Sequence, residues 1–259
     1  MILLLGGFVR LERLAIPEAE LVDPVWAQHD RSSALTVDHG AWDRFLRSYV
    51  EADGVGLNRV AYARVSPADR AALDGYLERL AAVPVQELAR PEQLAFWVNL
   101  YNARTVALVL DHYPVDSIRD VKFKLFALGP WSEPLLEMQG HKLSLHDIEH
   151  RIIRPLWPDP RIHYLLNCAA VGCPDLGRTA YSSTSIEAAM EEAAGAYAND
   201  PRGVRFDDRG RMTVSKIYLW YEEDFGGSSA AILAHLAALR RSGARCPPPG
   251  PAPDRRLCL

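Results

Sequence analysis

A long apolar stretch in the first half of the chain is the strongest constraint on its fold. The residues from Leu94 to Leu110 are apolar on nearly every side of the helix that they would form. A helix of this kind is usually buried at the centre of a domain. Pro91 marks its start, and Pro114 ends it, because proline disfavours the helical conformation of the residue before it. We therefore expect a central buried helix.

The composition excludes several classes of protein. The chain has 259 residues, of which 49% are hydrophobic, too large a share for a disordered protein. It carries 29 Lys and Arg against 33 Asp and Glu, a net charge of −4, which argues against a dedicated nucleic-acid binder. Four cysteines in such a length do not make a disulfide scaffold.

The two ends of the chain differ from the rest. Met1 to Val9 is apolar, but no Lys or Arg precedes it, so no working secretory signal is expected, a truncated signal being the alternative. Three consecutive prolines follow Cys246 and cannot continue a helix. We expect an N-terminal extension over residues 1–36, one domain over 37–241 and a disordered proline-rich tail over 242–259. With no stretch apolar enough to span a bilayer, a soluble, cytoplasmic protein is expected as the sequence stands.

Helices dominate the first part of this domain and short strands gather later. Helices are predicted after Asp38, from Ser66 to Val83, from Ser144 with Asp147 as its reciprocal capping partner, from Thr184 to Ala198 and from Ser228 to Arg241. Hairpins are predicted over 135–143 and 204–214, a buried strand over His163–Cys168, and a strand or extended loop over 121–128. The pattern predicts a single α+β domain whose central helix packs on a small, mainly antiparallel sheet.

Asn99 and Asn102 lie three residues apart on the central helix, and so on one face of it. A buried amide without partners costs a few kcal/mol, so both must be hydrogen-bonded. They either tie the helix to the backbone of a loop or orient a catalytic side chain or a substrate carbonyl. Both interpretations stay open.

The segment His146-Asp147-Ile148-Glu149-His150 has the letters H-x-x-E-H of one class of zinc peptidase. Two histidines four apart on a helix can share a metal, and Glu149 could activate its water. The predicted helix is short, however, and Asp147 already has a capping role. A catalytic or buried hydrogen-bonded pair of Glu149 and His150 is the better interpretation.

Cys168 follows the predicted buried strand, and Cys173 lies five positions further on. With a histidine base nearby, Cys168 could be an activated thiolate nucleophile. Free cysteine is also a common inert core residue. The third alternative is a metal site or a disulfide that involves both cysteines.

The aromatic and acidic run from Ile217 to Gly227 contains Trp220. Such a run lines a pocket for a cationic or sugar-like group, or packs in the core with a solvated acidic edge.

Several ordered motifs resemble the domain of unknown function 547 family in its bacterial form. They are FWVNLYNARTVALVL, HYPVDSIRDV, GPW, LSLHDIEHRIIRPLW, DPRIHYLLNCAAVGCPDL, RGVR and SKIYLWYEEDFGG, from about Val37 to Leu239. The family has no settled activity, and its plant relatives are discussed as interaction proteins. Many bacterial relatives have a signal peptide or a lipoprotein-like start, which implies periplasmic or secreted relatives. The resemblance carries over Asn99, Tyr101, Asn102, Glu149, His150 and Cys168, and Cys173 for bacterial members.

The combined hypothesis is a thiol-dependent hydrolase or acyltransferase acting on an amide or peptide bond, with a papain-like or transglutaminase-like arrangement. Cys168 is the nucleophile, His150 its base, and Asn99, Asn102 or Glu149 the orienting group. Tyr101, Asn167, Cys173 and Trp220 are expected to contact a peptide or small-molecule substrate, and no cofactor or metal is expected. The alternatives are a non-catalytic interaction module that binds a protein partner and a zinc-dependent hydrolase.

Overall fold

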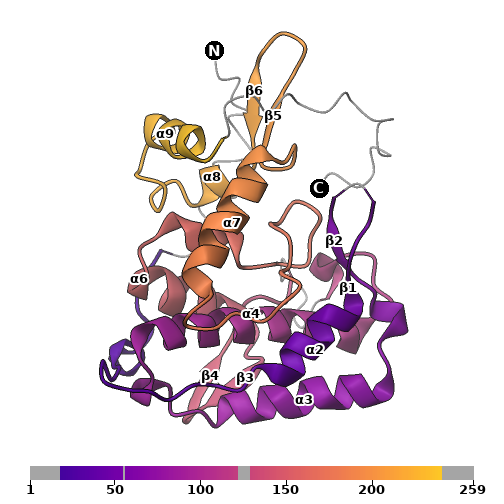
Figure 1. Ribbon diagram of the computed structural model, residues 1–259, viewed down its shortest axis with the longest axis vertical. Coiled ribbons are helices and arrows are strands. Elements are labelled where there is room, and N and C mark those ends of the chain that lie inside the picture. The colour runs from indigo at the N-terminus through magenta and orange to yellow at the C-terminus, as the bar shows by residue number, and fades with distance from the viewer. Residues whose placement is uncertain (1–17, 55, 122–128, 241–259) are drawn as a thin grey trace.

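The computed structural model describes residues 18–54, 56–121 and 129–240 (Figure 1). Within them the chain forms a single α+β domain, as predicted, with helices as the main element. Residues 1–17 of the predicted N-terminal extension, the proline-rich tail and all but the first residue of the segment 121–128 lie outside the described residues.

The central helix is α4 (Arg90–His112), and it confirms the strongest sequence prediction. It spans the width of the molecule in Figure 1, with α2 (Gly40–Tyr49) and α3 (Pro67–Ala81) on one side and α7 (Ile186–Asn199) on the other. Its side chains from Glu92 to Ala103 are buried without interruption. Within the described stretches, no helix is both long enough and apolar enough to cross a bilayer.

The remaining helices are all shorter than α4. They are α5 (Leu145–Ile148), the π-helix η5 (Glu149–Ile153), α6 (Arg154–Leu156), α8 (Ile217–Trp220), α9 (Ser229–Leu239) and the 3-10 helices η1 (Pro24–Ala27), η2 (Tyr62–Arg64), η3 (Val85–Glu87), η4 (Ile118–Asp120) and η6 (Pro160–Tyr164). Ser144 and Asp147 form the predicted reciprocal capping box of α5. Thr184 does not cap α7, because Ser185 holds the position before Ile186.

The strands form three separate antiparallel hairpins rather than one sheet in the described part of the chain. They are β1 (Val50–Ala52) with β2 (Asn58–Val60), β3 (Leu136–Met138) with β4 (His141–Leu143), and β5 (Val204–Phe206) with β6 (Met212–Val214). Each strand is three residues long, and the hairpins are separated along the chain by helices. Two of the hairpins were predicted from their turns, β3–β4 and β5–β6.

The predicted buried strand over His163–Cys168 is wrong. Its first residues belong to η6, where Asp159 accepts a hydrogen bond from the backbone N–H of Arg161 and Pro160 starts the helical turn. This capping chemistry just before His163 outweighs the apolar run that suggested a strand, and the residues after Tyr164 form a turn and a loop.

Two apolar clusters make up the core, and α7 belongs to both. The larger cluster surrounds α4 and includes Trp97 and Trp26, whose rings meet edge to face. Trp26 lies before residue 37, where the predicted domain begins. The smaller joins Tyr197 of α7 to the segment of α8 and α9 in the upper part of Figure 1. Since Ile186 lies in the larger cluster and Tyr197 in the smaller one, α7 connects the two clusters.

We expect Leu100→Ala to lower the free energy of unfolding by about 2–5 kcal/mol, because the truncation leaves a cavity in a close-packed core. Leu100 is 1% exposed, whereas Leu35 is 51% exposed. The same truncation at Leu35 should change stability by less than about 0.5 kcal/mol. Urea unfolding of both variants measures the difference, and equal losses would contradict the central position of α4.

Candidate functional site

The amide of Asn99 holds the backbone of a distant loop. Its Nδ2 donates to the carbonyl of Tyr181 at 2.8 Å, and its Oδ1 accepts from the Tyr181 N–H at 3.1 Å. The side chain is fully buried. Both hydrogen bonds go to the backbone of one residue, Tyr181. The Asn99 side chain therefore links α4 to the loop before α7.

Asn102 does the same for the chain after η6. Its Nδ2 donates to the carbonyl of Leu165 at 2.8 Å, and its Oδ1 accepts from the N–H of Asn167 at 2.9 Å. Both asparagines therefore follow the first of the two interpretations, in which they tie α4 to loop backbone. No hydrogen bond between either amide and Cys168 or His150 is present among the described residues.

Cys168 is bonded to Cys173 in a disulfide, with the two Cα atoms 6.1 Å apart. The loop between them is held by Asn167, whose Nδ2 donates to the carbonyl of Pro174 at 2.8 Å and whose Oδ1 accepts from the N–H of Ala169 at 2.9 Å. Cys168 is partly exposed and Cys173 is buried. The disulfide alternative is the one that the structure contains, and in this state Cys168 has no free thiolate.

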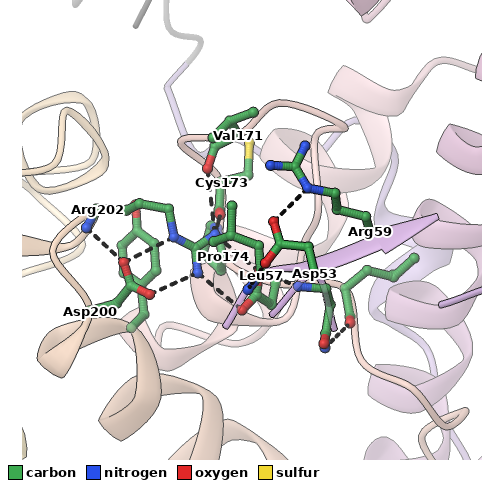
Figure 2. A network of polar contacts seen from close by, with 12 residues as sticks. Asp53, Leu57, Arg59, Val171, Cys173, Pro174, Asp200 and Arg202 are labelled. Atoms are coloured by element: carbon green, nitrogen blue, oxygen red, sulfur yellow. Dashed lines mark hydrogen bonds and ion pairs between the residues drawn. The ribbon is translucent and has the colours of Figure 1, made fainter. Parts of the chain in front are cut away.

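The Arg202 side chain makes hydrogen bonds to this loop (Figure 2). It donates from Nη1 and Nη2 to the two oxygens of Asp175, each at 3.0 Å, and from Nε to Asp200 at 2.9 Å. It also donates to the carbonyl of Cys173 at 3.2 Å. Burial lowers the pKa of Arg202, but the bonds to Asp200 and Asp175 outweigh it and raise the pKa above its ordinary value.

The same loop is attached to β2, through the backbone N–H of Asn58, which donates to Asp175 at 3.3 Å, and the Asn58 Nδ2, which donates to the carbonyl of Leu176 at 2.9 Å. Figure 2 shows the neighbouring hairpin pair Asp53 and Arg59, 2.6 Å apart, beside it. The disulfide loop is thus held between the end of α7 and the β1–β2 hairpin.

A second group of polar side chains is buried around Glu149. Tyr101 donates to one carboxylate oxygen at 3.0 Å and Tyr221 to the other at 2.8 Å. Burial raises the pKa of Glu149, but the neighbouring His150 and His163 rings and these two hydrogen bonds outweigh it, so the pKa is lowered and the carboxylate stays ionised. Burial raises the pKa of both tyrosines well above the ordinary value, which keeps their hydroxyls as donors.

His150 lies beside this carboxylate in the π-helix and is 2% exposed. Its Nδ1 lies 3.3 Å from Nη1 of Arg154. Because a guanidinium can only donate, Nδ1 accepts, and the proton of the neutral ring is on Nε2. Burial lowers the pKa of His150 to about 4, and the nearby charge of Glu149 only partly opposes this. At neutral pH His150 is therefore an uncharged imidazole.

Arg154 also makes a bidentate ion pair with Asp224, at 2.7 and 3.0 Å. Asp224 accepts a third bond from Nε2 of His163 at 2.7 Å, and the His163 ring stacks on Tyr221 with centroids 4.0 Å apart. Burial raises the pKa of Asp224, but the bonds from His163 and Arg154 outweigh it and hold the pKa well below its usual range. We call Tyr101, Glu149, His150, Arg154, His163, Tyr221 and Asp224 the buried polar cluster.

Four members of the buried polar cluster were not predicted as its members. Arg154, Tyr221 and Asp224 stand only inside sequence motifs, and His163 was expected as the first residue of a buried strand. Trp220, predicted to contact substrate, has the ammonium of Lys216 5.9 Å from its ring centroid, and its neighbour Tyr221 enters the cluster instead. The sequence signal that points to these residues is the run of acidic and aromatic side chains after Ile217. An acidic side chain in such a run needs a hydrogen-bonding partner if it is buried.

The structure gives Cys168 and His150 different partners. The Cys168 sulfur is bonded to Cys173, and its loop is attached to β2, whereas His150 contacts Arg154 and precedes α6. Among the described residues, no contact joins Cys168 to His150, so the predicted pair of nucleophile and base is not formed in this oxidised state.

The Nδ1 atoms of the two histidines of H-x-x-E-H also have different hydrogen-bonding partners. The Nδ1 of His146 lies 3.0 Å from the Ser132 hydroxyl, that of His150 faces Arg154, and Glu149 is engaged by two tyrosines. In the described stretches no three His, Cys, Asp or Glu side chains are arranged to hold a metal ion. The geometry of this motif thus fits a hydrogen-bonded cluster.

We expect the protein to lose stability as the pH falls from 6.5 to 4, because the folded state resists protonation of His150 while the unfolded chain does not. The contribution of uncharged His150 to the free energy of unfolding is fully present above pH 6.5. By pH 4 the loss amounts to about 3 kcal/mol. His150→Asn keeps an acceptor for Arg154 but cannot titrate, so its stability should fall less steeply. Urea unfolding at pH 8.0, 6.5, 5.5 and 4.5 measures both slopes. Equal slopes would show that His150 is not buried as an uncharged ring.

Arg202→Gln should destabilise the protein by about 2 kcal/mol, because it leaves two partly buried carboxylates without their cation. Arg211 provides a matched control, since it pairs with Asp207 at 2.6 Å but its side chain is 53% exposed. Arg211→Gln should change stability by less than about 0.5 kcal/mol. Thermal unfolding without reductant compares the two, and a similar effect of both would contradict the fastening role of Arg202.

Comparison with known proteins finds one family match. Residues 85–198 match the family described as Protein of unknown function, DUF547. This stretch holds α4, η5, the disulfide loop and nearly all of α7, whereas Arg202, Tyr221 and Asp224 lie beyond it. Searches of curated proteins and of solved structures gave no significant match. The stretch 85–198 is thus similar to the DUF547 family of proteins of unknown function.

Proposed function

We propose that this chain carries out thiol chemistry at Cys168, in an oxidised form that is closed by Cys173 and a reduced form that is open. The observation that carries this proposal is the asymmetry of the disulfide, whose Cys168 is partly exposed while Cys173 is buried. An incoming thiolate can reach only an accessible sulfur, so Cys168 is the one that is attacked.

The loop around this disulfide supports the proposal because it is held at both ends. Asn102 holds the residues before Cys168, and Arg202 holds the residues after it. A reactive group on a rigid support keeps its geometry through a catalytic cycle. Reduction therefore opens one bond in a loop whose other contacts stay in place.

The reaction class that needs least from the surroundings is thiol–disulfide exchange. A thiolate of a peptide or protein dithiol attacks the Cys168 sulfur, the bond to Cys173 breaks, and Cys173 leaves as a thiolate that takes up a proton. The second thiol of the substrate loses its proton and attacks the mixed disulfide. The substrate is then oxidised by two electrons, and both cysteines of this chain are reduced. A disulfide of this kind supports an oxidising compartment.

The reduced thiol also supports the hydrolase or acyltransferase inferred from the sequence. Cys168 would attack the carbonyl of an amide-type bond and form a thioester, which water or an acceptor amine then cleaves. The proton acceptor would have to be a group other than His150, whose Nδ1 faces Arg154.

A non-catalytic interaction module is the second candidate, and one observation favours it. Asn99, Asn102 and Glu149 are each engaged in hydrogen bonds inside the fold. Buried polar networks of this kind also serve only to specify a structure. The two candidates differ in whether the cysteine pair reacts.

The test uses the full chain with the tail cysteines replaced, Cys246→Ser and Cys258→Ser, so that only Cys168 and Cys173 respond. We expect this protein to oxidise a dithiol peptide and to become reduced itself, as followed by mass spectrometry. With Cys173→Ser added, the reduced Cys168 thiolate should attack the disulfide form of the same peptide and break its S–S bond, and the mixed disulfide on Cys168 should accumulate, because no Cys173 thiolate is present to resolve it. With Cys168→Ser added, no such adduct should form.

Two further outcomes decide between the alternatives. If the reduced protein does not exchange but releases a burst of one nitrophenol per chain from p-nitrophenyl acetate, with the acetyl group on Cys168, acyl transfer is the better description. If the pair neither exchanges nor acylates, and reduced Cys168 reacts with iodoacetamide no faster than in the unfolded chain, the thiol proposal fails and the interaction module stands.

A further inference from the structure

An open hollow of about 490 Å³ lies at the start of α4 and shares no residue with the disulfide loop or the buried polar cluster. Its lining is His29, Arg31, Ala89, Arg90 and Pro91. Two segments far apart in sequence therefore meet there, and both bring basic side chains.

The two arginines of this hollow have no carboxylate within ion-pair distance among the residues that the structure describes. The acids next to them in sequence are engaged elsewhere. Asp30 accepts from the N–H and hydroxyl of Ser32, and Glu92 accepts from the N–H of Val37 at 2.8 Å. The hollow thus carries positive charge that its own carboxylates do not neutralise.

Arg90 is fixed in place by uncharged groups. It donates to Gln93 Oε1 at 2.9 Å and to the carbonyl of Ala27 at 2.8 Å, and its guanidinium lies over the ring of Trp157, 5.4 Å from the centroid. Burial and the nearby charge of Arg31 lower the pKa of Arg90, so its cation is less stable than a solvated one. An anion bound beside both arginines would remove this repulsion.

His29 adds a directed donor. Nη2 of Arg90 lies 2.9 Å from the His29 Nδ1, so this nitrogen accepts the bond, whereas the carbonyl of Ala27 is 3.5 Å away from it. The proton of the neutral ring is then on Nε2, where it can be donated to a ligand. The hollow therefore combines two arginine cations with one N–H donor.

We propose that this hollow binds a phosphate-type dianion, such as inorganic phosphate or the phosphate group of a small metabolite, through Arg31, Arg90 and His29. Guanidinium groups match the oxygen spacing of phosphate and donate to two oxygens at once. Two uncompensated positive charges favour a dianion over a monoanion such as acetate. This binding is independent of the thiol chemistry.

The test titrates inorganic phosphate into the full chain at low ionic strength and follows binding by calorimetry. We expect saturable binding that becomes about tenfold weaker in Arg31→Gln, the loss of one charged contact, and weaker again when His29→Gln is added. Arg178→Gln removes the same charge from an exposed residue outside the hollow and should bind phosphate as the wild type does. Added potassium chloride should weaken the binding, because salt screens exposed charges.

Both Arg31 and His29 lie at the surface or partly exposed, so their variants should fold, and thermal unfolding without phosphate checks this. Phosphate affinity equal to the wild type in Arg31→Gln, or an equal loss in Arg178→Gln, would overturn the proposal. Succinate and acetate are titrated in parallel. If succinate binds more tightly than phosphate, the hollow selects dicarboxylates and the phosphate assignment is wrong.

Discussion

The amide of Asn102 lies in the middle of a helix that is buried over most of its length, and its hydrogen bonds to Leu165 and Asn167 connect that helix to the disulfide loop. An unpaired amide there would cost a few kcal/mol, so the loop backbone must take the one path that supplies a carbonyl and an N–H. Asn99 imposes the same condition on the loop at Tyr181. The position of Cys168, directly after Asn167, follows from this constraint.

The buried polar cluster shows how charges are kept inside such a fold. Glu149 and Asp224 are negative and Arg154 is positive: Glu149 accepts hydrogen bonds from two tyrosines, and Arg154 pairs with Asp224 and lies over the Tyr221 ring. The desolvation cost of buried charges is offset only when the pairing is this complete. Part of the cluster comes from the π-helix η5, whose wider turn carries Glu149 and His150 inside the core. Such π-helical turns are frequent at functional sites.

Cys168 is bonded to Cys173 and His150 faces Arg154, and these different partners decide how the protein's chemistry is described. A thiol enzyme with a histidine base needs both within hydrogen-bond reach of one another. Disulfide exchange needs only an accessible sulfur and a resolving partner, and Cys168 with Cys173 supplies both. The cluster then contributes stability and the pH dependence of His150, while the loop carries the proposed reaction.

The elements with local signals could be predicted from the sequence. The buried helix α4, the capping box of Ser144 and the hairpins of β3–β4 and β5–β6 depend on residues a few positions apart, and the apolar pattern and turn chemistry indicate them directly. The partners of the buried polar side chains could not be predicted, because they depend on how the chain packs. Arg154 and Asp224 are 70 residues apart, and Asn102 selects its loop across 63. The periodicity of the sequence does not predict such pairs. A buried polar group bonds to the groups that the packed chain places within hydrogen-bond distance, however far apart they are in sequence.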